Sequence, residues 1–195
     1  MPGKNNFMNA SMADITQDNL KQRAARIKLL LMDVDGVLTD GRLINVSAPD
    51  GSMLETKAFD SQDGIALQWL SWNGIATGVI SGRLSPATAE RAKQVKMTYV
   101  YQGHIEKIPV LEEILAKSGI TPEETAYTGD DLTDVVVMRR VGFAIATANA
   151  RPEVKRAAHY VTTAAGGQGA IREVAELLLQ AQGRWSAILK KYEVD

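Results

Sequence analysis

Short apolar runs alternate with longer stretches in which apolar positions recur at helical spacing, which is the pattern of strands connected by helices. The apolar run within residues 28–34 is too short for a typical helix and ends in acidic residues, so it predicts a strand buried on both faces at the centre of a sheet. Further strands are predicted over residues 75–80, 97–101, 126–128, 143–147 and 160–163. Helices are predicted over residues 15–27, 63–72, 86–95, 106–118, 132–141, 152–157 and 170–182.

This alternation predicts an α/β fold, a Rossmann-like three-layer sandwich with a mainly parallel sheet covered by helices on both faces. One segment departs from it, because residues 43–46 and 53–59 flank the turn-rich SAPDGS and predict a β-hairpin. We expect a single domain over residues 15–185, with the hairpin forming a flap at about residues 42–60. The expected ends are a flexible leader over residues 1–14 and a C-terminal tail over residues 186–195.

Composition narrows the possible functions. The 195 residues carry 22 basic and 23 acidic side chains, a net charge of −1, so no broad positive field exists to attract a nucleic acid or an anionic membrane. The absence of cysteine excludes disulfides, thiolate metal sites and cysteine nucleophiles, and fits a reducing compartment. No apolar run approaches the roughly 20 residues of a membrane span, and the N-terminal stretch lacks the apolar core of a secretory signal. We therefore expect a cytoplasmic protein.

Ligands of a parallel α/β fold bind beyond the carboxyl ends of the strands, and polar segments follow several of the predicted strands. The first, DVDGVLTDG, places Asp33 and Asp35 where the predicted central strand ends. Gly36 lets main-chain N–H groups approach an anion closely. Taken alone, such a string is as often a plain acidic loop or a run of calcium ligands. Its position directly after a buried strand favours the functional interpretation.

Two further segments offer groups that bind phosphate. In VISGR, Ser81 can hydrogen-bond a phosphate oxygen, and Arg83 presents a planar fork suited to a carboxylate or a phosphate. Lys107 begins a later predicted helix, from which its ammonium can reach the same cleft. A serine and glycine after a strand usually form a turn, and a lone lysine at a helix start is usually a solvated charge. These residues therefore carry weight only in combination.

The last segment, TGDDLTD, contains Asp130, Asp131 and Asp134 between a predicted strand and a predicted helix. Acidic residues at a helix start also favour the helix dipole, so capping alone is an alternative explanation. Together with Asp33 and Asp35, however, they gather negative charges that would repel one another unless a cation lay among them. Magnesium is the preferred ion, because it accepts one or two carboxylates together with water and a substrate phosphate.

In their order along the chain, these four segments resemble the motifs of the haloacid dehalogenase superfamily, over about residues 28–185. The resemblance implies a magnesium-dependent phosphatase in which a small β-hairpin replaces a large cap domain. Asp33 would be the nucleophile that forms an aspartyl-phosphate, and Asp35 the general acid and base. By the same resemblance, Ser81 and Lys107 would be catalytic residues that hold the phosphate oxygens. The ligands of Mg²⁺ would be Asp33, the backbone carbonyl of Asp35, and Asp130. Asp131 and Asp134 would orient Lys107 or a metal-bound water.

A narrower resemblance is to the family of 3-deoxy-D-manno-octulosonate 8-phosphate (KDO 8-phosphate) phosphatases. It rests on DVDGVLTDG, on the segment KAFDSQDGIAL after the hairpin, on GGQGAIREV and on AQGRW. It implies a sugar-acid phosphate substrate in lipopolysaccharide precursor synthesis, and a homotetramer in which the hairpins associate and a neighbour's C-terminal segment reaches the site. The implied substrate-binding residues are Gly36, Gly82, Arg83 and Arg172.

Some positions depart from the superfamily pattern, and other functions stay open. Glu106 and Asn149 stand where aspartate is more common, and TDVVVM replaces the usual sequence after the acidic pair, which leaves the exact substrate open. Another 2-keto-3-deoxy sugar-acid phosphate, such as the nine-carbon KDN 9-phosphate, is one alternative. A phospho-accepting receiver module shares the acidic cluster, magnesium and lysine, and a non-catalytic appendage is a third possibility.

Overall fold

Strand β1 (Leu29–Met32) lies in the middle of a six-stranded sheet in the computed structural model, which describes residues 12–194. All four of its residues are buried, and it pairs in parallel with a strand on each side, as its continuous apolar run predicts. The sheet is parallel throughout. Its order is β5 (Tyr99–Gln102), β4 (Ala76–Ser81), β1, β6 (Thr125–Gly129), β7 (Phe143–Ala146) and β8 (Tyr160–Val161).

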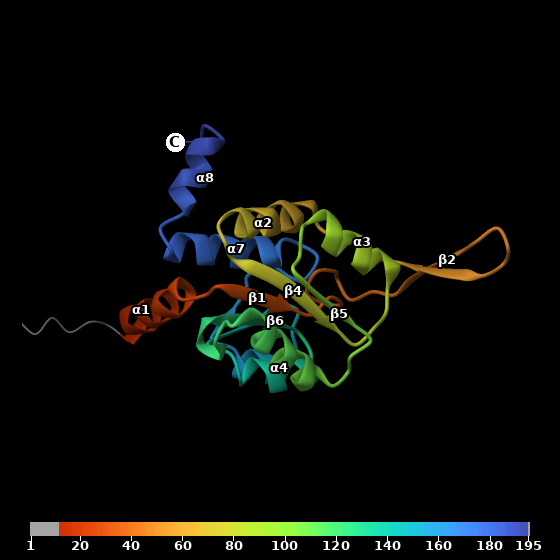
Figure 1. Cartoon of the computed structure of the whole chain (residues 1–195), viewed down its shortest axis with the longest axis horizontal. Coiled ribbons are helices and arrows are strands. Elements are labelled where there is room, and N and C mark those ends of the chain that lie inside the picture. Colours follow the sequence, from red (N-terminus) through yellow and green to blue (C-terminus); the bar gives the residue numbers. More distant parts are fainter. Residues whose placement is uncertain (1–11, 195) are drawn as a thin grey trace, which may run out of the picture.

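Helices cover both faces of the sheet, so the predicted three-layer α/β fold is confirmed (Figure 1). Successive residues of a strand point to opposite faces, and accordingly Leu30 and Met32 pack into one core while Leu29 and Leu31 pack into the other. The first core lies under α1 (Met12–Ala25), α2 (Ser61–Trp72) and α7 (Ala170–Ala181). The second lies under α4 (Lys107–Ser118), α5 (Leu132–Met138) and α6 (Pro152–Ala157). Helix α3 (Pro86–Gln94) precedes β5.

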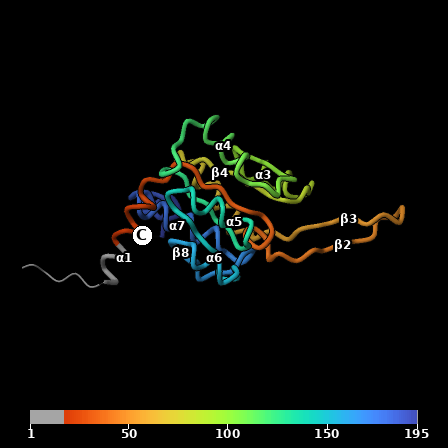
Figure 2. The backbone as a smooth tube through the Cα atoms, turned by 90° about the horizontal axis from the view of Figure 1, so that it is seen from below, coloured from red at the N-terminus to blue at the C-terminus, as the bar shows by residue number. Residues whose placement is uncertain are grey.

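The predicted β-hairpin is present and extends away from the sheet (Figures 1 and 2). It consists of β2 (Ile44–Ser47) and β3 (Met53–Thr56), which pair antiparallel as a separate sheet. Its apolar side chains are exposed, with Met53 at 62% and Leu54 at 55%. Exposed apolar side chains gathered on a projecting element are typical of an association surface.

Several boundaries differ from the prediction, and one helix is not predicted at all. Helix α1 begins at Met12, before its expected start at 15, and the part of the predicted leader over residues 1–11 lies outside the described residues. Helix α5 ends at Met138 instead of 141, because the chain turns there and the Arg140 amide bonds the Val137 carbonyl at 2.8 Å. Helix α8 (Trp185–Lys191) begins at the last residue of the predicted domain and continues into the predicted tail.

Tertiary contacts with α2 explain why the local pattern misses α8. The rings of Trp69 and Trp185 meet edge to face with centroids 5.6 Å apart, and the Trp69 indole N–H donates to the Tyr192 hydroxyl at 3.2 Å. Such a short helix is marginal on its own and depends on packing. No helix within residues 12–194 combines the length and the apolar character needed to cross a membrane.

Candidate active site

A pocket of about 370 Å³ lies where the carboxyl ends of β1, β4 and β6 meet. The register places Met32 of β1 opposite Val79 of β4 and Thr128 of β6, so the polar residues that follow these positions converge at one edge of the sheet. The predicted site residues that line the pocket are Asp33, Asp35, Ser81, Gly82, Arg83, Lys107, Asp130 and Asp131. The four separated sequence segments therefore form one site.

Lys107 is a buried ammonium rather than a surface charge. Its side chain is only 2% exposed, and its Nζ lies 2.7 Å from Asp134 Oδ1, 3.1 Å from the Tyr127 hydroxyl and 3.2 Å from Asp33 Oδ1. Burial by itself would lower the pKa of Lys107, but the neighbouring carboxylates of Asp134 and Asp33 outweigh it and raise the pKa above its ordinary value. The lysine therefore carries a fixed positive charge beside Asp33.

Asp134 holds this lysine in place. Its Oδ1 accepts hydrogen bonds from Lys107 and from the Tyr127 hydroxyl at 2.7 Å, while its Oδ2 accepts from the amides of Asp130 at 2.9 Å and Asp131 at 3.1 Å. Both oxygens of Asp134 are thus engaged in organising Lys107 and the loop that carries the acidic pair. The role of Asp134 in orienting Lys107 during catalysis stays a prediction.

Tyr127 is a member of the site that the sequence analysis misses. It is fully buried within β6, and burial together with the charges of Asp134 and Asp33 raises its pKa well above the ordinary value. The hydroxyl therefore stays protonated and serves as a donor to Asp134. A tyrosine inside a buried strand gives no local signal of this contact, because its partner lies seven positions along the chain.

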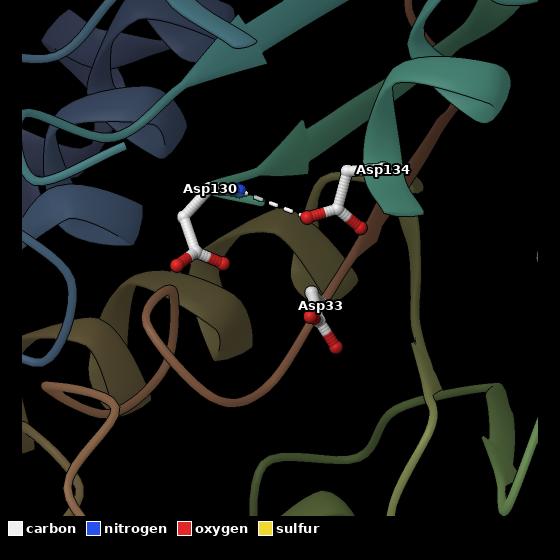
Figure 3. Close-up of side chains that lie close together, drawn as sticks. All are labelled: Asp33, Asp130 and Asp134. Atoms are coloured by element: carbon white, nitrogen blue, oxygen red, sulfur yellow. Dashed lines mark hydrogen bonds between the residues drawn. The ribbon is translucent and has the colours of Figure 1, made fainter. Parts of the chain in front are cut away.

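Asp33 and Asp130 form the part of the acidic cluster that can take a metal ion. One oxygen from each, with one from Asp134, all lie within 4.8 Å of one another (Figure 3). Since Asp134 is engaged elsewhere, Asp33 and Asp130 are the carboxylates left for a cation. Asp130 Oδ1 is buried and has no hydrogen-bond partner among the described residues. When such a carboxylate is ionised, a bound cation compensates for its lost hydration.

The protonation behaviour of the pair fits the same conclusion. Burial raises the pKa of Asp130 to about 7, and the charges of Asp134 and Asp33 add to the effect. Burial also raises the pKa of Asp33 to about 6, although Lys107 opposes it. Two neighbouring carboxylates that are costly to ionise together, one of them with an unpartnered oxygen, suit a hard divalent ion such as Mg²⁺. The backbone carbonyl of Asp35 as a third ligand stays a prediction.

Asp35 meets two basic side chains, one of which the sequence analysis misses. Its Oδ1 pairs with Lys57 Nζ, and its Oδ2 lies 3.8 Å from Arg83 Nε. Lys57 follows β3, and its side chain is 2% exposed. Glu55 of β3 pairs with Arg83 and lies 3.4 Å from Lys57 Nζ. Alternating residues of a strand share a face, and the alternation of Glu55 and Lys57 is a sequence signal that could have indicated this contact.

The loop after Asp35 is tightly packed against the acidic cluster. Gly36 has φ 88°, and a Cβ at this position would lie 2.0 Å from Asp130 Oδ2, so any other residue would strain the backbone and displace the Asp130 carboxylate. Its carbonyl accepts from Asn149 Nδ2 at 2.9 Å, while Asn149 Oδ1 accepts from the Gly166 amide at 2.6 Å. Gly36 therefore packs behind Asp130, and direct contact of Gly36 with a substrate stays a prediction.

Arg172 is a predicted substrate-binding residue that the single chain places away from the pocket. Its guanidinium lies 4.1 Å from the Trp69 ring centroid and 5.8 Å from that of Trp185, and it pairs with Glu176. Its amide donates to Asp63 Oδ1 at 2.7 Å, which fixes the first turn of α7. These contacts hold Arg172 beside α2 and α8. Substrate binding by Arg172 requires a neighbouring subunit and stays a prediction.

Known proteins resemble the chain in sequence and in structure. Residues 85–173 match the model of the haloacid dehalogenase-like hydrolase family. The chain is 41% identical to the 3-deoxy-D-manno-octulosonate 8-phosphate phosphatase KdsC of Yersinia pestis over 167 residues, which cover 86% of this chain and 87% of that one. Identity to the same phosphatase of Escherichia coli (strain K12) is 41% over 162 residues, covering 83% and 84%.

A solved structure agrees with these relatives. The crystal structure of 3-deoxy-D-manno-octulosonate 8-phosphate phosphatase from Moraxella catarrhalis, in complex with magnesium ion, phosphate ion and KDO, superposes with a TM-score of 0.85 at 40% identity. The match covers 90% of this chain and 98% of that one. By sequence identity, coverage and fold together, the chain belongs to the 3-deoxy-D-manno-octulosonate 8-phosphate phosphatase family of haloacid dehalogenase-like hydrolases.

Proposed function

We propose that the protein is a magnesium-dependent phosphomonoesterase that hydrolyses KDO 8-phosphate to KDO and inorganic phosphate, in lipopolysaccharide precursor synthesis. The observation that carries this proposal is the convergence of Asp33, Lys107 and Asp130 on one pocket in a chain that is 41% identical to KDO 8-phosphate phosphatases. The Moraxella catarrhalis relative contains magnesium, phosphate and KDO together, which supports both the cofactor and the substrate.

Asp33 is the proposed nucleophile. Its Oδ1 is held by the Val34 amide at 2.7 Å and lies 3.2 Å from Lys107 Nζ, so we assign the attack to Oδ2. This oxygen forms a bond to phosphorus while the bond from phosphorus to the sugar oxygen breaks, giving an aspartyl-phosphate. Asp35 donates a proton to the departing sugar oxygen. The first product is the free sugar acid.

Water completes the reaction in the second step. Asp35, now ionised, takes a proton from a water molecule as the water oxygen attacks phosphorus, and the bond to Asp33 breaks. Inorganic phosphate and the original carboxylate result. Ser81 Oγ accepts a hydrogen bond from the Arg83 amide at 3.2 Å. The hydroxyl proton of Ser81 is therefore left to be donated to a phosphoryl oxygen. Mg²⁺ bound by Asp33 and Asp130 would neutralise the acidic cluster and the phosphoryl group.

Substrate selection and assembly are the finer parts of the proposal. Arg83 lines the pocket and is 46% exposed, so it is placed to receive the carboxylate of a sugar acid once it leaves Glu55. Gly82 lies beside it and offers its amide.

The exposed apolar hairpin supports a homotetramer in which a neighbour supplies Arg172. We further propose one catalytic domain over residues 15–185 with a flap at 42–60, in the cytoplasm, which the lack of cysteine fits.

Phosphate release from a panel of substrates tests this function. The panel contains KDO 8-phosphate, the nine-carbon KDN 9-phosphate and ordinary hexose phosphates, each with Mg²⁺ and with EDTA. We expect the highest kcat/KM for KDO 8-phosphate and no turnover in EDTA. A higher kcat/KM for KDN 9-phosphate would refute KDO 8-phosphate as the preferred substrate. Turnover that is unaffected by EDTA would refute the metal dependence.

A further inference from the structure

We propose that Lys57, at the base of the hairpin, is a positioning residue that holds the Asp35 carboxyl group for proton transfer; this rests on the proposed function, in which Asp35 is the acid and base. The hairpin would then serve catalysis within its own chain, in addition to any association between chains.

The burial of Lys57 is the first observation behind this proposal. Its side chain is 2% exposed, although lysine is among the residues least often buried. Its Nζ pairs with Asp35 Oδ1 and lies 3.4 Å from Glu55 Oε1. A buried ammonium is tolerated only when it is paired, so the lysine is confined to the place where both carboxylates meet it.

The arrangement of charges around Asp35 is the second observation. The carboxylates of Asp35 and Glu55 each contact both cations, Lys57 and Arg83, so the four side chains form one ion-pair network. Arg83 is 46% exposed and lies 3.8 Å from Asp35 Oδ2, and the proposed function has it turn to the substrate. Lys57 is then the cation that remains on Asp35. Its buried stem gives it few other rotamers.

The consequence for catalysis follows from the geometry of proton transfer. Asp35 must lie within hydrogen-bond reach of the departing oxygen in the first step and of the attacking water in the second. Small displacements of a catalytic group lower rates steeply. A sugar alkoxide needs a proton in order to leave, whereas p-nitrophenolate leaves without one. Loss of Lys57 should therefore affect the two kinds of substrate differently.

The experiment compares Lys57→Met with the wild type in Mg²⁺, using KDO 8-phosphate and p-nitrophenyl phosphate. With KDO 8-phosphate we expect kcat to fall by about 100-fold and KM to change little. With p-nitrophenyl phosphate, stopped-flow traces should show one equivalent of p-nitrophenolate released at the wild-type rate, followed by slow turnover, because only the second step then needs Asp35. Lys57→Arg should restore much of the lost kcat.

Controls separate positioning from other roles. Lys117→Met removes an exposed lysine that pairs with Glu113, and should leave all rates unchanged. Lys57→Gln serves if the methionine variant does not fold, as judged by circular dichroism. A rise in KM without a fall in kcat, or an equal loss in both phases with p-nitrophenyl phosphate, would overturn the proposal. A wild-type enzyme that turns over another alkyl phosphate but not KDO 8-phosphate would refute only the proposed substrate, and the comparison then uses that phosphate.

Discussion

Replacing Asp130 with asparagine should stabilise the metal-free protein while abolishing magnesium binding. Burial and the nearby carboxylates raise the pKa of Asp130 from its ordinary 3.8 to about 7. Because the folded-state pKa lies above the unfolded value, the contribution of Asp130 to the stability of the folded protein is highest below pH 3.8, where the carboxyl group is protonated. This contribution is lost as the pH rises through 7, because the buried group must then ionise in the folded state. Asparagine cannot ionise, so Asp130→Asn avoids the loss.

The magnitude follows from the size of the pKa change. The full change corresponds to about 4 kcal/mol, and partial exposure of the carboxyl group to solvent reduces this to about 2 kcal/mol. In EDTA the variant should therefore unfold with a free energy about 2 kcal/mol higher than the wild type at pH 8. The difference should shrink as the pH falls towards 4, because Asp130 is then protonated in the folded state and the pH approaches its ordinary pKa of 3.8 in the unfolded chain.

Urea unfolding in EDTA at several pH values between 4 and 8 measures this difference. Saturating Mg²⁺ provides the complementary test, because an ion that binds only the folded state at 100 times its Kd adds about 2.7 kcal/mol. Mg²⁺ should raise the stability of the wild type and leave that of Asp130→Asn unchanged. A difference that does not vary with pH, or a wild type that is more stable at pH 8 in EDTA, would refute the reasoning.

The remaining predictions concern other parts of the site. Asp33→Asn should abolish phosphate release and keep the circular dichroism spectrum; normal turnover would exclude Asp33 as nucleophile. Asp134→Ala should lower the free energy of unfolding by about 3–5 kcal/mol, because it leaves Lys107 buried without its closest carboxylate; a loss under about 1 kcal/mol in urea unfolding would contradict this. Gly36→Ala should weaken Mg²⁺ binding in calorimetry, since its Cβ would displace Asp130. Gly51→Ala is the matched control, because Gly51 also has positive φ but nothing within 4 Å, and equal effects of the two variants would refute the contact.

The local pattern was sufficient to predict the layers and the edge of the sheet at which the polar segments converge. The apolar run of β1 indicated a central strand, and the structure buries all four of its residues between two parallel neighbours. Strands linked by helices usually run parallel, and here they do, which brings their carboxyl ends, with Asp33, Ser81 and Asp130, to one edge. Periodicity and chain order are properties of short segments, and the sequence displays them directly.

Only the tertiary structure decided what each polar side chain meets. Lys107 has the sequence context of a surface residue, yet packing buries it between Asp134 and Asp33. Lys57 reaches Asp35 across 22 positions, and Arg172 stacks on Trp69 instead of entering the pocket. Burial and pairing of these groups depend on segments that are distant along the chain, so a local pattern cannot specify them. The sequence by itself determined which groups gather at the edge of the sheet, and packing determined their partners, their charge and their orientation.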